Sequence, residues 1–170
     1  MKKIFFVAAL TAVTGLANAQ KTNMTKHLRF SVGGELGLPV GSFSNTHSIG
    51  FGVTAQADYP LSSKTDLTLN TGYMTFSGKT AVGNLKYSSF NYVPLLAGVK
   101  YWFSSNVYGS GQLGLSFGTG SGSGSNFTFA PGIGFKFNNQ WDALLKYTTI
   151  SASGGSLGNL GLRVGYTFGK

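Results

Sequence analysis

The stretch FTFAPGIGFKF, residues 127–137, carries a bulky apolar residue at every odd position and a small, polar or charged residue at every even one. Successive side chains of a β-strand point to opposite faces, so this period of two predicts a strand with one apolar and one polar face. Pro131 belongs to the apolar face and Lys136 to the polar face. The fold class therefore depends on which of the two faces meets water.

The same alternation recurs along the rest of the chain. The expected strands are residues 28–38, 48–59, 65–75, 90–103, 107–117, 127–137, 141–149 and 159–168. The connections after the second, fourth and sixth strands are short, whereas those after the first, third, fifth and seventh are longer. Short turns at one end and longer loops at the other are typical of outer-membrane barrels, whose longer loops face outside the cell.

Composition indicates that water does not cover much of this protein. Charged residues make up 10% of the chain, whereas a soluble domain carries about 25%. After residue 19 no run approaches the roughly 18 apolar residues of a transmembrane helix. A closed β-barrel is the other structure that satisfies its backbone groups in lipid, and it suits an exported chain without cysteine. We therefore predict an all-β fold, an eight-stranded antiparallel up-and-down transmembrane β-barrel, with both mature termini on the periplasmic side.

Residues 1–19 are expected to be a cleaved secretory signal, which leaves residues 20–170 as the barrel domain. Lys2 and Lys3 make a positive start, residues 4–13 form an apolar core, and Ala17-Asn18-Ala19 is a small-residue cleavage site. The alternative is a transmembrane anchor, which needs about 20 apolar residues. Export predicts that the mature protein resides in the outer membrane of a Gram-negative-type cell.

The placement of charge indicates which face is wet. Nine charged residues fall on the polar faces of the expected strands: Arg29, Glu35, Asp58, Asp66, Lys100, Lys136, Asp142, Lys146 and Arg163. Glycine, serine and threonine dominate these faces, which suits the crowded lumen of a narrow barrel better than a water-exposed exterior. Because buried charges persist only when paired, we expect an interlocked lumen charge network, with Lys136 directed towards Asp142 or its neighbours. A selectivity ring of a pore is the alternative.

Aromatic residues on the apolar faces gather near the strand ends. One group, at the expected periplasmic end, is Tyr59, Tyr101, Phe103, Phe137, Trp141 and Phe168, and the other, at the outer end, is Phe51, Tyr73, Phe117, Phe127 and Tyr147. Barrels in membranes carry such aromatic girdles at both interfaces. The alternative explanation is the ordinary preference of aromatic residues for strands.

Three segments carry a resemblance to a known family. They are GLPVGSF (37–43), VPLLAGVKYWF (93–103) and the closing GYTF (165–168). The sequence resembles the small outer-membrane β-barrel proteins, OmpA/OmpX-like or "porin family", over residues 28–168. The resemblance implies an architectural rather than a catalytic protein. It also implies the outer-membrane insertion machinery as a partner during biogenesis, because the aromatic Phe168 resembles that machinery's recognition signal.

Motifs that could carry enzyme chemistry lack their structural context. The stretch GSGQLG (109–114) matches a dinucleotide-binding fingerprint, but it continues as a strand where that motif requires a helix. Ser42, Ser44 and His47 share a loop without an acid to complete a hydrolase triad. His27 and His47 have no companions at metal-site spacing. We expect no enzymatic activity, no cofactor and no metal.

The predicted role is that of an integral outer-membrane barrel with a side-chain-filled lumen and a structural or surface-interaction function. The alternatives are a narrow channel for ions or small solutes, and an exported soluble barrel that binds an apolar ligand. Expected partners are outer-membrane lipid and lipopolysaccharide, whose phosphates Lys79 and Lys86 could meet; the alternative is that both lysines are merely solvated. The net charge of +9 is not gathered into a basic stripe, so no nucleic-acid partner is expected.

Pro131 is the residue that fits the expected barrel least well. Proline has no amide hydrogen to donate to a neighbouring strand. We therefore expect a local bulge or a missing bond at this point of the sheet.

Overall fold

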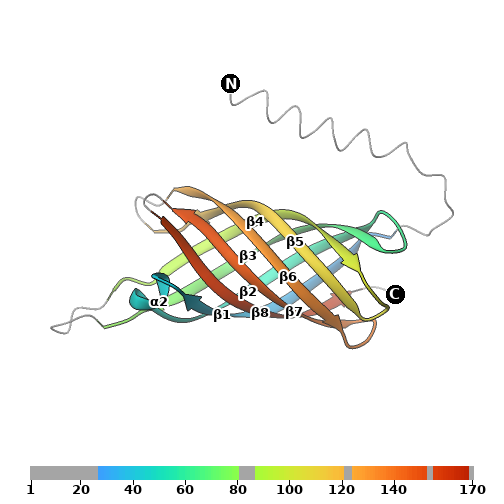
Figure 1. Cartoon of the computed structure of the whole chain (residues 1–170), viewed down its shortest axis with the longest axis horizontal. Helices are drawn as coiled ribbons and strands as arrows, with labels where there is room; N and C mark the ends of the chain where they lie inside the picture. The colour runs from blue at the N-terminus through green and yellow to red at the C-terminus, as the bar shows by residue number, and fades with distance from the viewer. Residues whose placement is uncertain (1–26, 81–86, 121–123, 153–154, 169–170) are drawn as a thin grey trace, which may run out of the picture.

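The structure is a computed structural model that describes residues 27–80, 87–120, 124–152 and 155–168. Its eight strands form one closed barrel, in which every strand pairs antiparallel with its sequence neighbours and β1 pairs with β8 (Figure 1). The strands are β1 Arg29–Val40, β2 His47–Pro60, β3 Thr65–Gly78, β4 Phe90–Trp102, β5 Val107–Gly118, β6 Ser125–Lys136, β7 Trp141–Ala152 and β8 Gly155–Phe168. The predicted eight-stranded up-and-down barrel is confirmed, while the predicted signal, residues 1–19, lies outside the described residues.

The two ends of the barrel differ. The connections 61–64, 103–106 and 137–140 lie at one end, called here the turn end, where the start of β1 pairs with the end of β8. The short helix α2 (Phe43–Thr46) lies at the opposite end, called here the cap end (Figure 1). No helix in the described part of the chain is long and apolar enough to cross a membrane.

The connection between β7 and β8 is shorter than predicted. Residues 150–158 were expected to be a loop, but the pairing of the two strands continues up to Ala152 and Gly155. The side chains explain the extension, because Ile150 points inward and is buried, and Leu157 packs against the same interior cluster. At Ile150 the inward face of β7 itself becomes apolar, so the alternation of apolar and polar residues no longer marks the strand from this point on.

The apolar faces of the strands point outward. Phe127 and Ile133 of β6 are each more than half exposed, whereas Thr128 and Ala130 on the other face are buried. A soluble barrel with an apolar ligand cavity would show the opposite arrangement. The exterior is therefore suited to lipid, and the core of the molecule lies in its lumen.

Pairing between β6 and β7 is interrupted at Pro131. The register runs from Thr128 and Phe129, omits Ala130 and Pro131, and resumes at Gly132 without a shift. The expected missing bond is thus confirmed, and there is no bulge. Pairing between β5 and β6 continues through Pro131. β3 and β4 show a second interruption of this kind beside Pro94, again without a shift of register.

A glycine in β6 makes room for a large lumen side chain. Gly134 lies under the ring of Tyr108, and a Cβ atom at this position would overlap that ring. Tyr108 is itself buried and packs against Trp102, with 4.9 Å between the ring centroids. The ring therefore has little freedom to move away from an added methyl group.

We expect Gly134→Ala to lower the free energy of unfolding by about 1–3 kcal/mol, because overpacking forces neighbouring side chains out of place. Gly111→Ala on β5 is the matched control, since a Cβ atom there meets no atom within 4 Å. The measurement is urea unfolding in lipid vesicles, followed by tryptophan fluorescence. Equal stability of the two variants would contradict the packing described for Tyr108.

Candidate functional site in the barrel lumen

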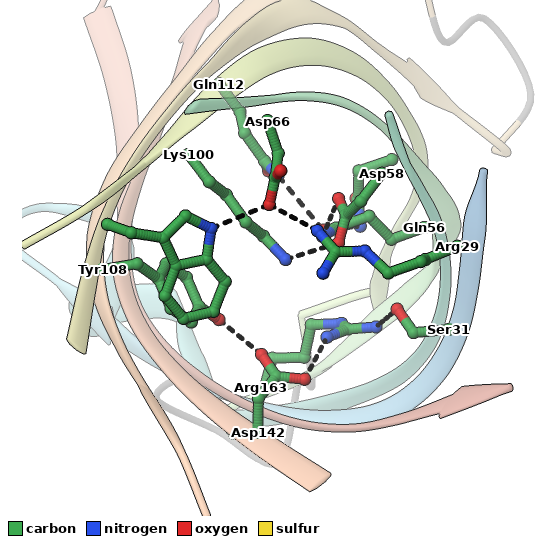
Figure 2. A network of polar contacts seen from close by, with 12 residues as sticks. Arg29, Ser31, Gln56, Asp58, Asp66, Lys100, Tyr108, Gln112, Asp142 and Arg163 are labelled. Carbon is green, nitrogen blue, oxygen red and sulfur yellow. Dashed lines mark hydrogen bonds and ion pairs between the residues drawn. The ribbon is translucent and has the colours of Figure 1, made fainter. Parts of the chain in front are cut away.

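Two ion pairs cross the lumen near the turn end. Arg29 Nη2 lies 2.6 Å from Asp66 Oδ2, and Lys100 Nζ lies 2.6 Å from Asp58 Oδ2. Their strand register would instead place Arg29 beside Asp58 and Asp66 beside Lys100. Each long cation thus passes its nearest acid and pairs with one a strand further on (Figure 2). The two pairs together tie β1, β2, β3 and β4 across the lumen.

A third ion pair is centred on Arg163 of β8. Its guanidinium Nη1 lies 3.7 Å from Asp142 Oδ1, and the guanidinium donates a hydrogen bond to Ser31 Oγ at 2.9 Å (Figure 2). It also donates to Thr54 Oγ1 at 2.8 Å. The hydroxyl of Tyr108 donates to the other oxygen of Asp142. Arg163 is 1% exposed. Five strands therefore hold one buried guanidinium and its carboxylate.

The fourth pair lies apart from these three. Lys146 Nζ of β7 is 2.9 Å from Glu35 Oε2 of β1, and both side chains are buried. Glu35 is paired in register with Arg163, yet Arg163 bonds elsewhere. The four ion pairs include all four acids of the chain.

Lys136 does not pair with Asp142, although the two are register partners in β6 and β7. The carboxylate of Asp142 is already bonded to Tyr108 and lies beside Arg163. Lys136 instead places its ammonium 5.9 Å from the ring centroid of Trp102. Within the described chain it has no ion pair. The expectation was that Lys136 points towards Asp142 or its neighbours: no ion pair with Asp142 forms, and Lys136 lies at the mouth of the lumen, where it lines one small cavity together with Asp142.

Three amide side chains that sequence reasoning missed extend the network. Asn70 Nδ2 and Gln112 Nε2 donate to Gln56 Oε1 at 3.3 and 3.2 Å, and Gln56 Nε2 donates to Asp58 Oδ1 at 2.8 Å. All three lie on inward faces and are buried. Their positions on the inward faces of their strands would have identified them, since a filled lumen needs uncharged polar partners as well as charged groups.

The cap end of the lumen is closed by apolar side chains, a feature that sequence reasoning also missed. The cluster contains Phe43, Met74, Phe76, Tyr92 and Ile150, with Phe90 and Leu157 packed against it. Phe43 of α2 reaches into the barrel, and its ring centroid lies 5.1 Å from that of Phe76. These inward positions directly continue the polar faces of their strands. The alternation places Met74 and Tyr92 on the inward faces, whereas Phe43 and Ile150 fall in segments expected to be loops.

The loops at the cap end hold α2 in place. Lys79 Nζ donates to the carbonyl of Ser44 at 2.6 Å, and the Lys79 amide donates to the carbonyl of Thr46 at 2.8 Å. His47 contacts Thr46 Oγ1 at 2.8 Å and the carbonyl of Ser88 at 3.2 Å. Lys86, the other lysine considered for lipopolysaccharide, lies outside the described residues.

No catalytic arrangement forms from the candidate residues of this region. Ser44 Oγ donates to the carbonyl of Gly41. Over the ranges that the structure describes, no hydrogen bond joins His47 to Ser42, Ser44 or an acid. Those ranges also contain no group of three metal-ligating side chains. The dinucleotide-like stretch 109–114 lies inside β5.

The residues of the two proposed aromatic girdles all lie on the outside of the barrel. Exposed outward side chains include Tyr59, Tyr101, Phe103, Phe137, Trp141, Phe168, Phe51, Tyr73, Phe117, Phe127 and Tyr147. At the turn end, neighbouring rings meet edge to face, as Trp141 and Tyr166 do at 5.1 Å and Tyr166 and Phe168 at 5.2 Å between centroids. Tyr166 joins this rim although sequence reasoning left it out.

Comparison with solved structures identifies similar barrels. Ail of Yersinia pestis, solved in complex with the heparin analogue sucrose octasulfate, has a TM-score of 0.60 and 16% identity, covering 85% of this chain and 100% of Ail. The N-terminal β-barrel domain of Pseudomonas aeruginosa OprF gives 0.55 and 12%, covering 82% and 97%. Neisserial surface protein A gives 0.51 and 13%, covering 83% and 97%. At these identities the likeness concerns the fold.

Comparison of the sequence with families gives a more specific result. No curated protein sequence matches the chain significantly. The family model described as "Outer membrane protein beta-barrel domain" matches residues 6–168, which is nearly the whole chain. The outward apolar belt and the closed antiparallel sheet agree with that match. The chain therefore belongs to the outer membrane protein β-barrel domain family and is an outer-membrane protein.

Proposed function

We propose that this protein is an outer-membrane barrel whose lumen is closed, so that its role is structural or is exerted through its surfaces. The observation that carries the proposal is that side chains close the lumen at two heights. Ion pairs span it towards the turn end, and the apolar cluster fills it at the cap end.

The charged closure supports the proposal because a barrel of eight strands is just wide enough for side chains to fill. A permeating ion would have to displace Arg163, which is bonded to Ser31 and Thr54 and paired with Asp142. Breaking such buried contacts leaves uncompensated charges in a region of low dielectric constant. The lumen charges therefore act as an interlocked plug and not as a selectivity ring.

The apolar closure supports the same conclusion by a different physical effect. Phe76 is fully buried, and it stacks parallel to Tyr92 with 6.3 Å between ring centroids. Phe43 covers both from α2, which Lys79 holds from the neighbouring loop. Hydrated ions are excluded from a filled apolar constriction because they would lose their water there. The two closures are independent, so the loss of one would leave the other.

The surfaces of the closed barrel are then the places where function is exerted. We propose that the outward aromatic residues anchor the barrel at both lipid interfaces. Ail was solved with a heparin analogue, which is a polyanion. At the cap end of this chain, the exposed Lys79 is a candidate contact for lipopolysaccharide phosphates. The insertion machinery remains the expected partner during biogenesis.

We expect the purified protein to show no steady ion conductance of porin size in planar lipid bilayers, since both closures block the lumen. A porin reconstituted in the same bilayers is the positive control, and heat-modifiable gel mobility verifies that the sample is folded. Steady conductance from the folded protein would overturn the closed-lumen proposal. It would support the narrow channel instead.

We expect Lys146→Ala to lower the free energy of unfolding by about 3–5 kcal/mol, because it leaves Glu35 buried and unpaired. The double variant Glu35→Leu with Lys146→Met should recover most of this loss, since apolar side chains of similar volume replace the pair. The matched control is Lys64→Ala, an exposed lysine, with an effect within about 0.5 kcal/mol. Urea titration in vesicles measures all three. A loss in the double variant as large as in the single one would show that the pair is not a coupled unit.

A further inference from the structure

A recess of about 510 Å³ opens at the turn end of the barrel, outside the charged closure. Its walls come from the β2–β3 connection, the β4–β5 connection and the first residue of β1. Neither the lipid-facing belt nor the closed lumen requires such a recess.

The recess carries an excess of positive charge. Arg29, Lys64 and Lys136 line it together with a single acid, Asp66. One oxygen of the Asp66 carboxylate is occupied, because Oδ2 accepts from Arg29 Nη2 at 2.6 Å and from Trp102 Nε1 at 2.8 Å. Lys64 and Lys136 have no ion pair with any residue that the structure describes. Two ammonium groups thus face the recess without a counter-charge.

The other polar groups of the wall are also available as donors. The hydroxyl oxygen of Ser62 accepts from the Lys64 amide at 3.3 Å, and that of Ser104 accepts from the Val107 amide at 3.1 Å. Each hydroxyl therefore keeps its own hydrogen to donate. A wall of charged and neutral donors is complementary to an oxyanion with several acceptor oxygens.

We propose that this recess binds a ligand bearing a dianionic phosphate group, held by Lys64 and Lys136 and by the hydroxyl groups of Ser62 and Ser104. The volume exceeds that of phosphate alone and leaves room for an organic part. The site does not depend on whether the lumen conducts. The shared chemistry is a phosphate monoester, which either a soluble molecule or a lipid headgroup can supply.

Titration of the full-length protein in maltoside detergent with inorganic phosphate tests the site directly. The readout is the NMR signal of the Trp102 indole N–H, with the lipid-facing Trp141, the other tryptophan of the chain, as the internal control. We expect Trp102 to shift and Trp141 to stay. Lys64→Ala and Lys136→Ala should each weaken binding about tenfold, the loss of one charge-assisted bond. Lys136→Arg should retain binding, and Gly111→Ala on β5, where a Cβ atom meets no atom within 4 Å, should leave it unchanged.

Two further arms distinguish the sources of the phosphate. Glycerol 3-phosphate is titrated in detergent, and nanodiscs with or without phosphatidic acid are compared in phosphate-free buffer. A Trp102 shift in either arm supports the site and names its source. No shift of Trp102 with any of the three probes would overturn the proposal. So would equal binding by a Lys64→Ala, Lys136→Ala double variant that gel mobility shows to be folded.

Discussion

Lipid offers no hydrogen-bond partner to a backbone amide, and this constraint determines the rest of the structure. Eight strands must close on themselves, and closure at this number leaves a lumen that only side chains can fill. The side chains then pack in two different environments, the lipid outside the barrel and the lumen within it. Outward residues need only be apolar, whereas inward residues must fit one another in size and charge. Specific contacts are therefore concentrated in the lumen.

The lumen solves this packing problem differently at its two ends. Towards the turn end, charged groups are paired across several strands, as Arg163 is with Asp142, Thr54 and Ser31. Towards the cap end, Phe43 and Phe76 exclude water instead. Glycines such as Gly134 let large neighbours lie flat against the wall. A soluble domain mixes polar and apolar side chains in one core, whereas this barrel stacks a polar and an apolar core along its axis.

The sequence predicted the wall of the barrel better than its contents. Alternation identified β6, its outward phenylalanines and the interruption at Pro131, because these depend on local geometry. It could not reveal the apolar cluster at the cap end. Phe76 lies on the inward face of β3, whereas its apolar side chain indicates a position on the outside of the barrel. Nor could it assign partners: Lys136 and Asp142 are neighbours in register, yet Asp142 lies beside Arg163 instead. Partner choice depends on side-chain reach across the lumen, which no single strand encodes.

The interruptions beside Pro94 and Pro131 divide the wall of the barrel unequally. The β3–β4 and β6–β7 interfaces each omit two residue pairs in mid-strand, while the other six interfaces are continuous there. The three strands β4 to β6 thus form one part of the wall, and the remaining five strands form the other part. Lys100 of the three-strand part and Asp58 of the five-strand part form an ion pair through the lumen. Tyr108 of the three-strand part likewise bonds to Asp142 of the five-strand part. Side chains thus connect the three-strand and the five-strand parts of the wall through the lumen, nearer the turn end than the interruptions themselves.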